Sequence, residues 1–138
     1  MTINYPSVSE REFLKKYLEF SNLLLTDEQR LAPAEMQLMI EFALLPDKFK
    51  YHRFSSLAKD KVIESVTELY GKTLTKLTIN NKLYTLLDKQ FLRRDIDKVI
   101  YMPKHFLAAL DAFRQQQAFS VTVNFKREDK EENRPSPS

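Results

Sequence analysis

Apolar residues recur at helical spacing in five segments of this 138-residue chain, and polar or proline-containing stretches separate these segments. The pattern predicts helices at about 9–25, 33–45, 78–90 and 104–117, and a further helix between Ser55 or Ser56 and Gly71. Pro33 and Pro103 stand at the start of two segments, where a helix tolerates proline, and Pro46 ends the second. The single glycine, Gly71, follows the third segment, where a left-handed residue commonly ends a helix.

Polar residues stand where the helices are expected to begin. Ser7 or Ser9 can cap the first helix, and Ser55 or Ser56 can cap the third. Thr78 is the expected cap of the fourth helix, which leaves residues 72–77 to turn the corner before it.

The same spacing predicts which side chains form the core. They are Phe13, Leu14, Tyr17, Leu18, Leu24 and Leu25 in the first helix; Met36, Met39, Ile40 and Ala43 in the second; Leu57, Ala58, Val62, Val66, Leu69 and Tyr70 in the third; Ile79, Leu83, Leu86 and Leu87 in the fourth; and Phe106, Leu107, Leu110 and Phe113 in the fifth.

Two other stretches favour β-structure. Turn residues Asp95 and Asp97 lie between β-prone residues, which predicts a hairpin with strands near 92–95 and 99–102. Residues 119–125 alternate apolar and polar, which predicts a strand that pairs with the N-terminal residues or with a neighbouring subunit. The charged tail 126–138 is expected to be disordered. The expected fold is a single domain over 1–125, mainly α with a small β component.

Composition argues against several classes of function. Cys is absent and only His52 and His105 occur, which disfavours thiolate and histidine metal sites. One glycine cannot form a phosphate-binding loop or a dinucleotide fingerprint. Paired carboxylates such as Asp95 and Asp97 have no nucleophilic or basic partner. We therefore expect neither an enzyme nor a cofactor. No membrane span or signal peptide is recognisable either, and we expect a cytoplasmic protein.

The positive charge is concentrated in the middle of the chain. The net charge is +3, with four basic and eight acidic residues over 7–47, but thirteen basic and six acidic residues over 48–104. Such asymmetry is typical of a face that contacts phosphates, although chance clustering on a solvated surface would look the same.

The segment from Thr78 to Pro103 is the most specific part of the sequence. It begins with a small polar residue, an aliphatic residue and two asparagines, which are Thr78-Ile79-Asn80-Asn81. Leu83, Leu86, Lys89 and Gln90 follow, and then Arg93-Arg94-Asp95 at the hairpin. With the helices before it, this order over 33–102 resembles a winged helix-turn-helix domain of the MarR-like kind. Gln90 departs from the glycine that is usual in that family. In general style the chain is also similar to small winged-helix proteins encoded by bacteriophages.

The resemblance implies a winged core over 33–102, flanked by 8–25 and 103–125, with the helix 78–90 as the recognition helix. Asn80 and Asn81 would pair with adenine, and Lys82 would reach guanine or phosphate. The remaining residues implied at the DNA interface are Lys76, Thr78, Thr85, Lys89, Arg93, Arg94 and Lys98. The flanking helices would form a homodimer. Two simpler readings stay open: the asparagines can cap or solvate the helix, and the two arginines can pair with Asp95 and Asp97.

Two functions follow as hypotheses. The first is binding of double-stranded DNA, with or without sequence preference, by a transcription regulator or replication accessory. The second is a structural or adaptor role, for example as a phage virion component or a host-factor binder, in which the strand 119–125 offers an edge to a protein partner. If the protein is viral, its location is expected to be the host cytoplasm.

Overall fold

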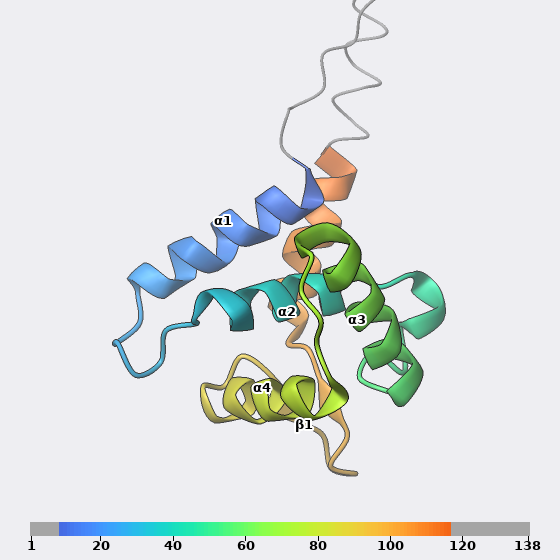
Figure 1. The fold of residues 1–138 in the computed structure, drawn as a ribbon. Helices are drawn as coiled ribbons and strands as arrows, with labels where there is room; N and C mark the ends of the chain where they lie inside the picture. Colours follow the sequence, from blue (N-terminus) through green and yellow to red (C-terminus); the bar gives the residue numbers. More distant parts are fainter. Residues whose placement is uncertain (1–8, 117–138) are drawn as a thin grey trace, which may run out of the picture.

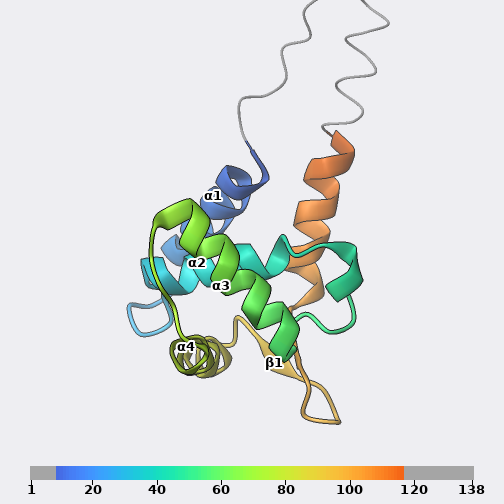
Figure 2. The ribbon, with the colours of Figure 1, turned by 45° about the vertical axis from the view of Figure 1, so that its right-hand side comes forward.

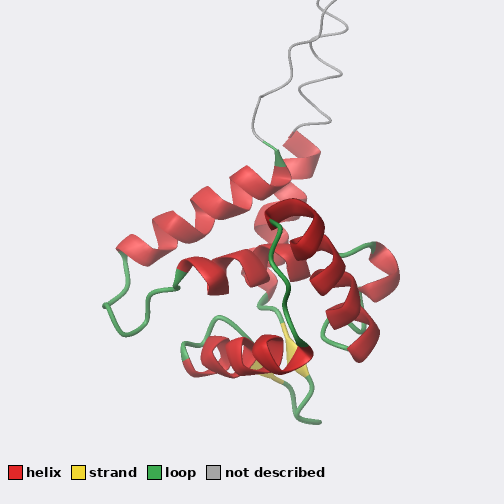
Figure 3. Ribbon diagram, in the orientation of Figure 1, coloured by secondary structure: helices red, strands yellow, loops and turns green. Residues whose placement is uncertain are grey.

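Helices make up most of residues 9–116, the part of the chain that the computed structural model describes (Figures 1 and 3). They are α1 (Glu10–Leu23), α2 (Pro33–Ala43), α3 (Ser56–Tyr70) and α4 (Lys76–Asp88), followed by a fifth α-helix over 104–116. A short 3₁₀ turn, η1 (Asp47–Phe49), follows α2, and strands β1 (Arg93–Arg94) and β2 (Ile100–Tyr101) follow α4. The mainly helical fold with a small β component is thus confirmed.

Hydrogen bonds at the helix starts show which of the candidate residues are the caps. The Ser9 hydroxyl accepts a hydrogen bond from the Glu12 N–H at the start of α1, and Ser55 accepts one from Ala58 at the start of α3. At α2 the Glu35 carboxylate accepts from the Ala32 N–H at 2.8 Å. Each contact satisfies a backbone donor that the helix itself leaves free.

The start of α4 corrects one expectation. Thr75, not Thr78, is its N-cap, because the Thr75 hydroxyl accepts a hydrogen bond from the Thr78 N–H at 3.2 Å. Lys76 and Leu77 are therefore helical, and Thr78 lies in the first turn.

Gln90 takes the left-handed conformation with φ 66° after the end of α4. The Phe91 N–H donates to the Leu86 carbonyl at 2.9 Å and the Gln90 N–H to the Leu87 carbonyl at 3.0 Å. This is the Schellman arrangement, in which glycine is usual. Gly71 ends α3 in the same conformation, with φ 65°, as expected.

Helix α2 lies at the centre of the fold. From Met36 to Ala43 every residue except Gln37 is buried. Helices α1 and α4 lie on opposite sides of α2, while α3 runs across α2 and also contacts α4 (Figures 1 and 2). The fifth helix packs against α1, since the rings of Phe13 and Phe113 stack with centroids 4.4 Å apart and Arg114 pairs with Glu10 at 2.8 Å.

The two strands form an antiparallel hairpin whose base is anchored in the core. Arg93 pairs with Tyr101, and Arg94 with Ile100. Leu92 and Met102, which flank the strands, are both buried. The hairpin therefore has the expected place, with strands shorter than the expected 92–95 and 99–102. It extends past α4 on the side away from α1 (Figures 1 and 2).

Several side chains that were expected in the core are exposed. Leu24, Leu57, Leu69 and Tyr70 are between 39% and 78% exposed. They stand at helix ends, where apolar spacing continues beyond the surface that a neighbouring helix covers. The expected strand 119–125, its partner at the N-terminus and the tail 126–138 lie outside the described residues.

Candidate nucleic-acid interface

One side of α4 is exposed within residues 9–116. Ile79, Leu83 and Leu86 are buried on its inner side. Opposite them lie Asn81 and two large side chains, Leu77 and Tyr84, which are 70% and 58% exposed. Sequence reasoning missed Leu77 and Tyr84, although the helical phase of the three buried residues turns both of them outward.

The two asparagines carry free amide groups. Asn81 is exposed and Asn80 is half-buried, and within residues 9–116 neither side chain forms a hydrogen bond. The nearby Thr85 hydroxyl bonds to the Asn81 backbone carbonyl at 3.2 Å and leaves the amide unused. Since α4 begins at Lys76, the asparagines lie inside the helix and do not cap it. Their amides can therefore donate to and accept from a ligand.

Thr78 and Lys82 lie on the flank of α4 that faces α2. Together with Lys72 they line a small crevice whose opposite wall includes Gln37 and Leu38 of α2. Lys82 is half-buried. Lys72 and Lys82 therefore lie close together along the edge of α4 that faces α2.

Lys89 lies on the same flank, but its side chain is half-buried and bonded to other parts of the fold. Its ammonium donates to Glu35 Oε1 and to the Arg30 carbonyl, both at 2.7 Å, and its side chain is only 19% exposed. Burial alone would raise the pKa of Glu35, but hydrogen bonds from Lys89 and the Ala32 N–H, with the charges of Lys89 and Lys82, hold that pKa below its ordinary value. Lys89 therefore serves the fold, and we leave it out of the interface.

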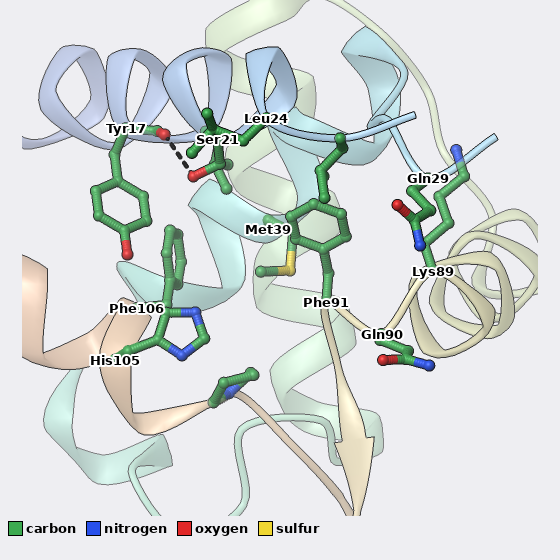
Figure 4. Close-up of a pocket in the computed structure, with 13 residues that line it drawn as sticks. Tyr17, Ser21, Leu24, Gln29, Met39, Lys89, Gln90, Phe91, His105 and Phe106 are labelled. Atoms are coloured by element: carbon green, nitrogen blue, oxygen red, sulfur yellow. Dashed lines mark hydrogen bonds between the residues drawn. The ribbon is translucent and has the colours of Figure 1, made fainter. Parts of the chain in front are cut away.

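The position of Lys89 is visible at the edge of a pocket of about 340 Å³ (Figure 4). This pocket lies between α1, the end of α4 and the start of the fifth helix. Met39, Phe91 and Phe106 supply its apolar lining. The pocket thus marks the junction that ties the end of α4 to α1.

Lys76 lies on the other flank of α4, towards α3. Its ammonium contacts Asp60 at 3.1 Å and also donates to the Ser56 hydroxyl. Asn80, one turn further along, is on the same flank. The Asp60 carboxylate offsets the charge of Lys76, which makes Lys76 a weaker attractor of anions than a free lysine.

The hairpin carries three exposed cations. Arg93, Arg94 and Lys98 are exposed, and no ion pair within residues 9–116 involves any of them. Arg94 donates instead to the Lys98 carbonyl at 3.1 Å. The expected alternative, pairing of the arginines with Asp95 and Asp97, is not found there.

The expected site residues thus fall into separate groups. Asn81 and Thr85 belong to the outer side of α4, Thr78 and Lys82 flank it towards α2, and Lys76 and Asn80 flank it towards α3. Arg93, Arg94 and Lys98 lie on the hairpin, and Lys89 is half-buried and paired with Glu35. From Leu77 to Tyr84 the outer side of α4 is thus an uncharged polar and apolar strip, which ends at the exposed Asp88, with cations on both sides.

Comparison with protein-family models, curated proteins and solved structures yields no match to this chain. Within residues 9–116, no helix has the length and apolar character to cross a membrane. The same residues contain no cluster of three or more acidic or histidine side chains that could hold a metal ion.

Proposed function

We propose that this protein binds double-stranded DNA as a winged helix-turn-helix, with α4 in the major groove and the hairpin on the adjoining backbone. The observation that carries the proposal is a pair of amides on α4, those of Asn80 and Asn81, beside a hairpin with three cations. Within residues 9–116 neither amide forms a hydrogen bond and none of the three cations forms an ion pair. This combination provides hydrogen-bonding groups for base edges and charges for phosphates in one surface.

The order of elements supports this proposal. Helices α3 and α4 pack together and are joined by residues 71–75, and the hairpin follows α4 directly. A helix about 10–12 Å across fits a major groove about 12 Å wide. With α4 in that groove, the hairpin would reach the neighbouring phosphates or the minor groove.

The side chains of α4 suit base recognition. The amide of Asn81 can pair with adenine in a bidentate manner, while Leu77 and Tyr84 can contact thymine methyl groups. Asp88, at the end of α4, would be repelled by phosphates. The first half of α4 is therefore the part that enters the groove, as in other helix-turn-helix docking arrangements.

Cations on both sides of this strip would hold the backbone. Lys72 and Lys82 would contact phosphates on one side, and Arg93, Arg94 and Lys98 on the other. Phosphate contacts would supply most of the affinity, and Asn80 and Asn81 would supply the sequence preference.

The test is the salt dependence of binding to a fluorescent random-sequence 30-base-pair duplex. We expect affinity to fall steeply with salt. The double variant Arg93→Ala/Arg94→Ala should reduce the log–log slope by about 1–2, because each phosphate contact contributes about 0.9.

The matched control is Lys15→Ala/Lys16→Ala, which removes the same charge from α1, on the far side of α2 from α4 (Figure 1). Its slope should equal that of the unsubstituted protein. Absence of duplex binding at low salt, or equal losses in both double variants, would contradict the proposal.

A role in transcription or replication, and a homodimer with recognition helices about 34 Å apart, extend this proposal. Phe20, Leu23 and Leu24 are each more than two-thirds exposed at the end of α1, which favours that helix as a contact with another chain. The adaptor alternative stays a prediction, since its strand 119–125 lies outside the described residues.

A further inference from the structure

Ile96 stands at the tip of the hairpin with 97% of its surface exposed. Within residues 9–116 no other large apolar side chain is more exposed. It contributes nothing to the core, and the proposed contacts of α4 do not use it. A β-branched apolar group is an unusual choice for the tip of a charged turn, where polar residues and glycine predominate.

The turn holds Ile96 in a defined position. The Asp95 carboxylate accepts hydrogen bonds from the Asp97 N–H at 2.8 Å and the Val99 N–H at 3.0 Å. The Lys98 N–H donates to the Asp95 carbonyl at 2.9 Å, and Lys98 itself is left-handed, with φ 65°. The backbone around Ile96 is therefore fixed before any partner arrives.

The hairpin as a whole carries a small excess of positive charge, which suits an anionic partner. Arg93, Arg94 and Lys98 outnumber Asp95 and Asp97, and Asp95 is committed to the turn. The Arg94 guanidinium lies along the tip, where it bonds to the Lys98 carbonyl at 3.1 Å. Val99 and Tyr101, further down the hairpin, are also exposed, at 55% and 41%, but Ile96 alone stands at the tip. Three separate side chains offer less apolar area than a protein or membrane contact usually uses.

We propose that Ile96 is a wedge that enters the minor groove and opens a base step, so that the bound duplex bends. This inference rests on the proposed function, since the hairpin would meet the minor groove beside the major groove that holds α4. Apolar wedges flanked by cations unstack base steps in this way. The groove is about 6 Å wide, so the cations beside Ile96 would lie close to the phosphates on its rims.

The wedge predicts a preference for deformable DNA. Pyrimidine–purine steps such as TA unstack more easily than other steps. Duplexes that contain TA steps should therefore bind more tightly and bend more than GC-rich duplexes without such steps.

The test uses the full chain and two 30-base-pair duplexes with a dye at each end, one with central TA steps and one GC-rich without them. Energy transfer between the dyes reports bending, and anisotropy reports affinity. With the unsubstituted protein, energy transfer should rise on the TA duplex. Ile96→Ala should remove most of this rise and weaken binding to the TA duplex about tenfold, while the salt slope stays unchanged.

Ile96→Leu keeps the apolar bulk and should retain bending, and Val99→Ala, which shortens an exposed side chain off the tip, should change little. A duplex that binds without bending, or equal bending with Ile96→Ala, overturns the wedge and leaves the proposed DNA binding intact. Failure of the unsubstituted protein to bind either duplex overturns both.

Discussion

At the scale of single residues, two cations near the end of α4 have opposite roles. Lys89 was predicted to contact DNA, but its ammonium is enclosed by Glu35 and the Arg30 carbonyl. Arg93, four residues later, is exposed and outside any ion pair within residues 9–116. The sequence does not distinguish them, because the partner of Lys89 lies 54 residues away along the chain and no spacing rule links the two.

Replacing Lys89 should reduce stability rather than DNA binding. Lys89→Met leaves the buried Glu35 carboxylate without its cation, which should cost about 2–4 kcal/mol in the free energy of unfolding at pH 7. Urea unfolding measures this loss, and the salt slope of duplex binding should stay unchanged. Lys16→Met, on the exposed side of α1, is the control and should change stability by less than about 0.5 kcal/mol.

The same pair gives a pH dependence with a definite sign. The pKa of Glu35 is lower in the folded state than its ordinary value of 4.5, so its contribution to stability is present above that pH and lost as pH falls through the folded pKa. The stability difference between the unsubstituted protein and Lys89→Met should therefore narrow below pH 4.5. A difference that stays constant with pH would show that Glu35 is not the group left unpaired.

At the scale of elements, periodicity predicted all five α-helices, and only their ends moved. The apolar face of α4 was enough to predict that this helix forms, but its first residue depends on whether Thr75 or Thr78 is the cap. Both are threonines before a helical run, and only the hydrogen bond between them, from the Thr78 N–H to the Thr75 hydroxyl, separates the two readings. The hairpin was predictable because Asp95 and Asp97 interrupt a β-prone run, but the exposure of Ile96 was not.

The left-handed residue after α4 offers a test at this scale. Gln90 has φ 66°, a conformation that costs a residue with a side chain about 1–2 kcal/mol. Gln90→Gly removes this strain but adds backbone freedom to the unfolded chain, so we expect a net gain of about 0.5–1 kcal/mol.

Gly71→Ala is the converse substitution at the end of α3. A Cβ at Gly71 would meet nothing within 4 Å, so only backbone strain opposes it, and a loss of about 1 kcal/mol is expected. Urea unfolding should show a higher free energy of unfolding for Gln90→Gly and a lower one for Gly71→Ala. Destabilisation by Gln90→Gly would mean that the Gln90 side chain contributes more than its strained backbone costs.

At the scale of the whole molecule, the acidic and basic segments of the sequence lie in different parts of the fold. The acidic first half forms α1 and α2, while the basic segment supplies α4 and the hairpin, which lie on the side of α2 away from α1 (Figures 1 and 2). Which lysines reach that surface could not be predicted, because the decisive contacts are made with other helices. Lys89 pairs with Glu35 of α2, and the charge of Lys76 is offset by Asp60 of α3. The polar strip between the cations also depends on Leu77 and Tyr84, which sequence reasoning had not selected.

The central claim is that the outer side of α4 and the hairpin meet duplex DNA together. The most direct measurement is a titration of ¹⁵N-labelled protein with a random-sequence 30-base-pair duplex, followed by amide chemical shifts. We predict shifts concentrated from Leu77 to Thr85 and from Arg93 to Lys98, with little change between Glu12 and Glu19 of α1. Shifts confined to α1 and the fifth helix, or no shifts at low salt, would contradict the claim.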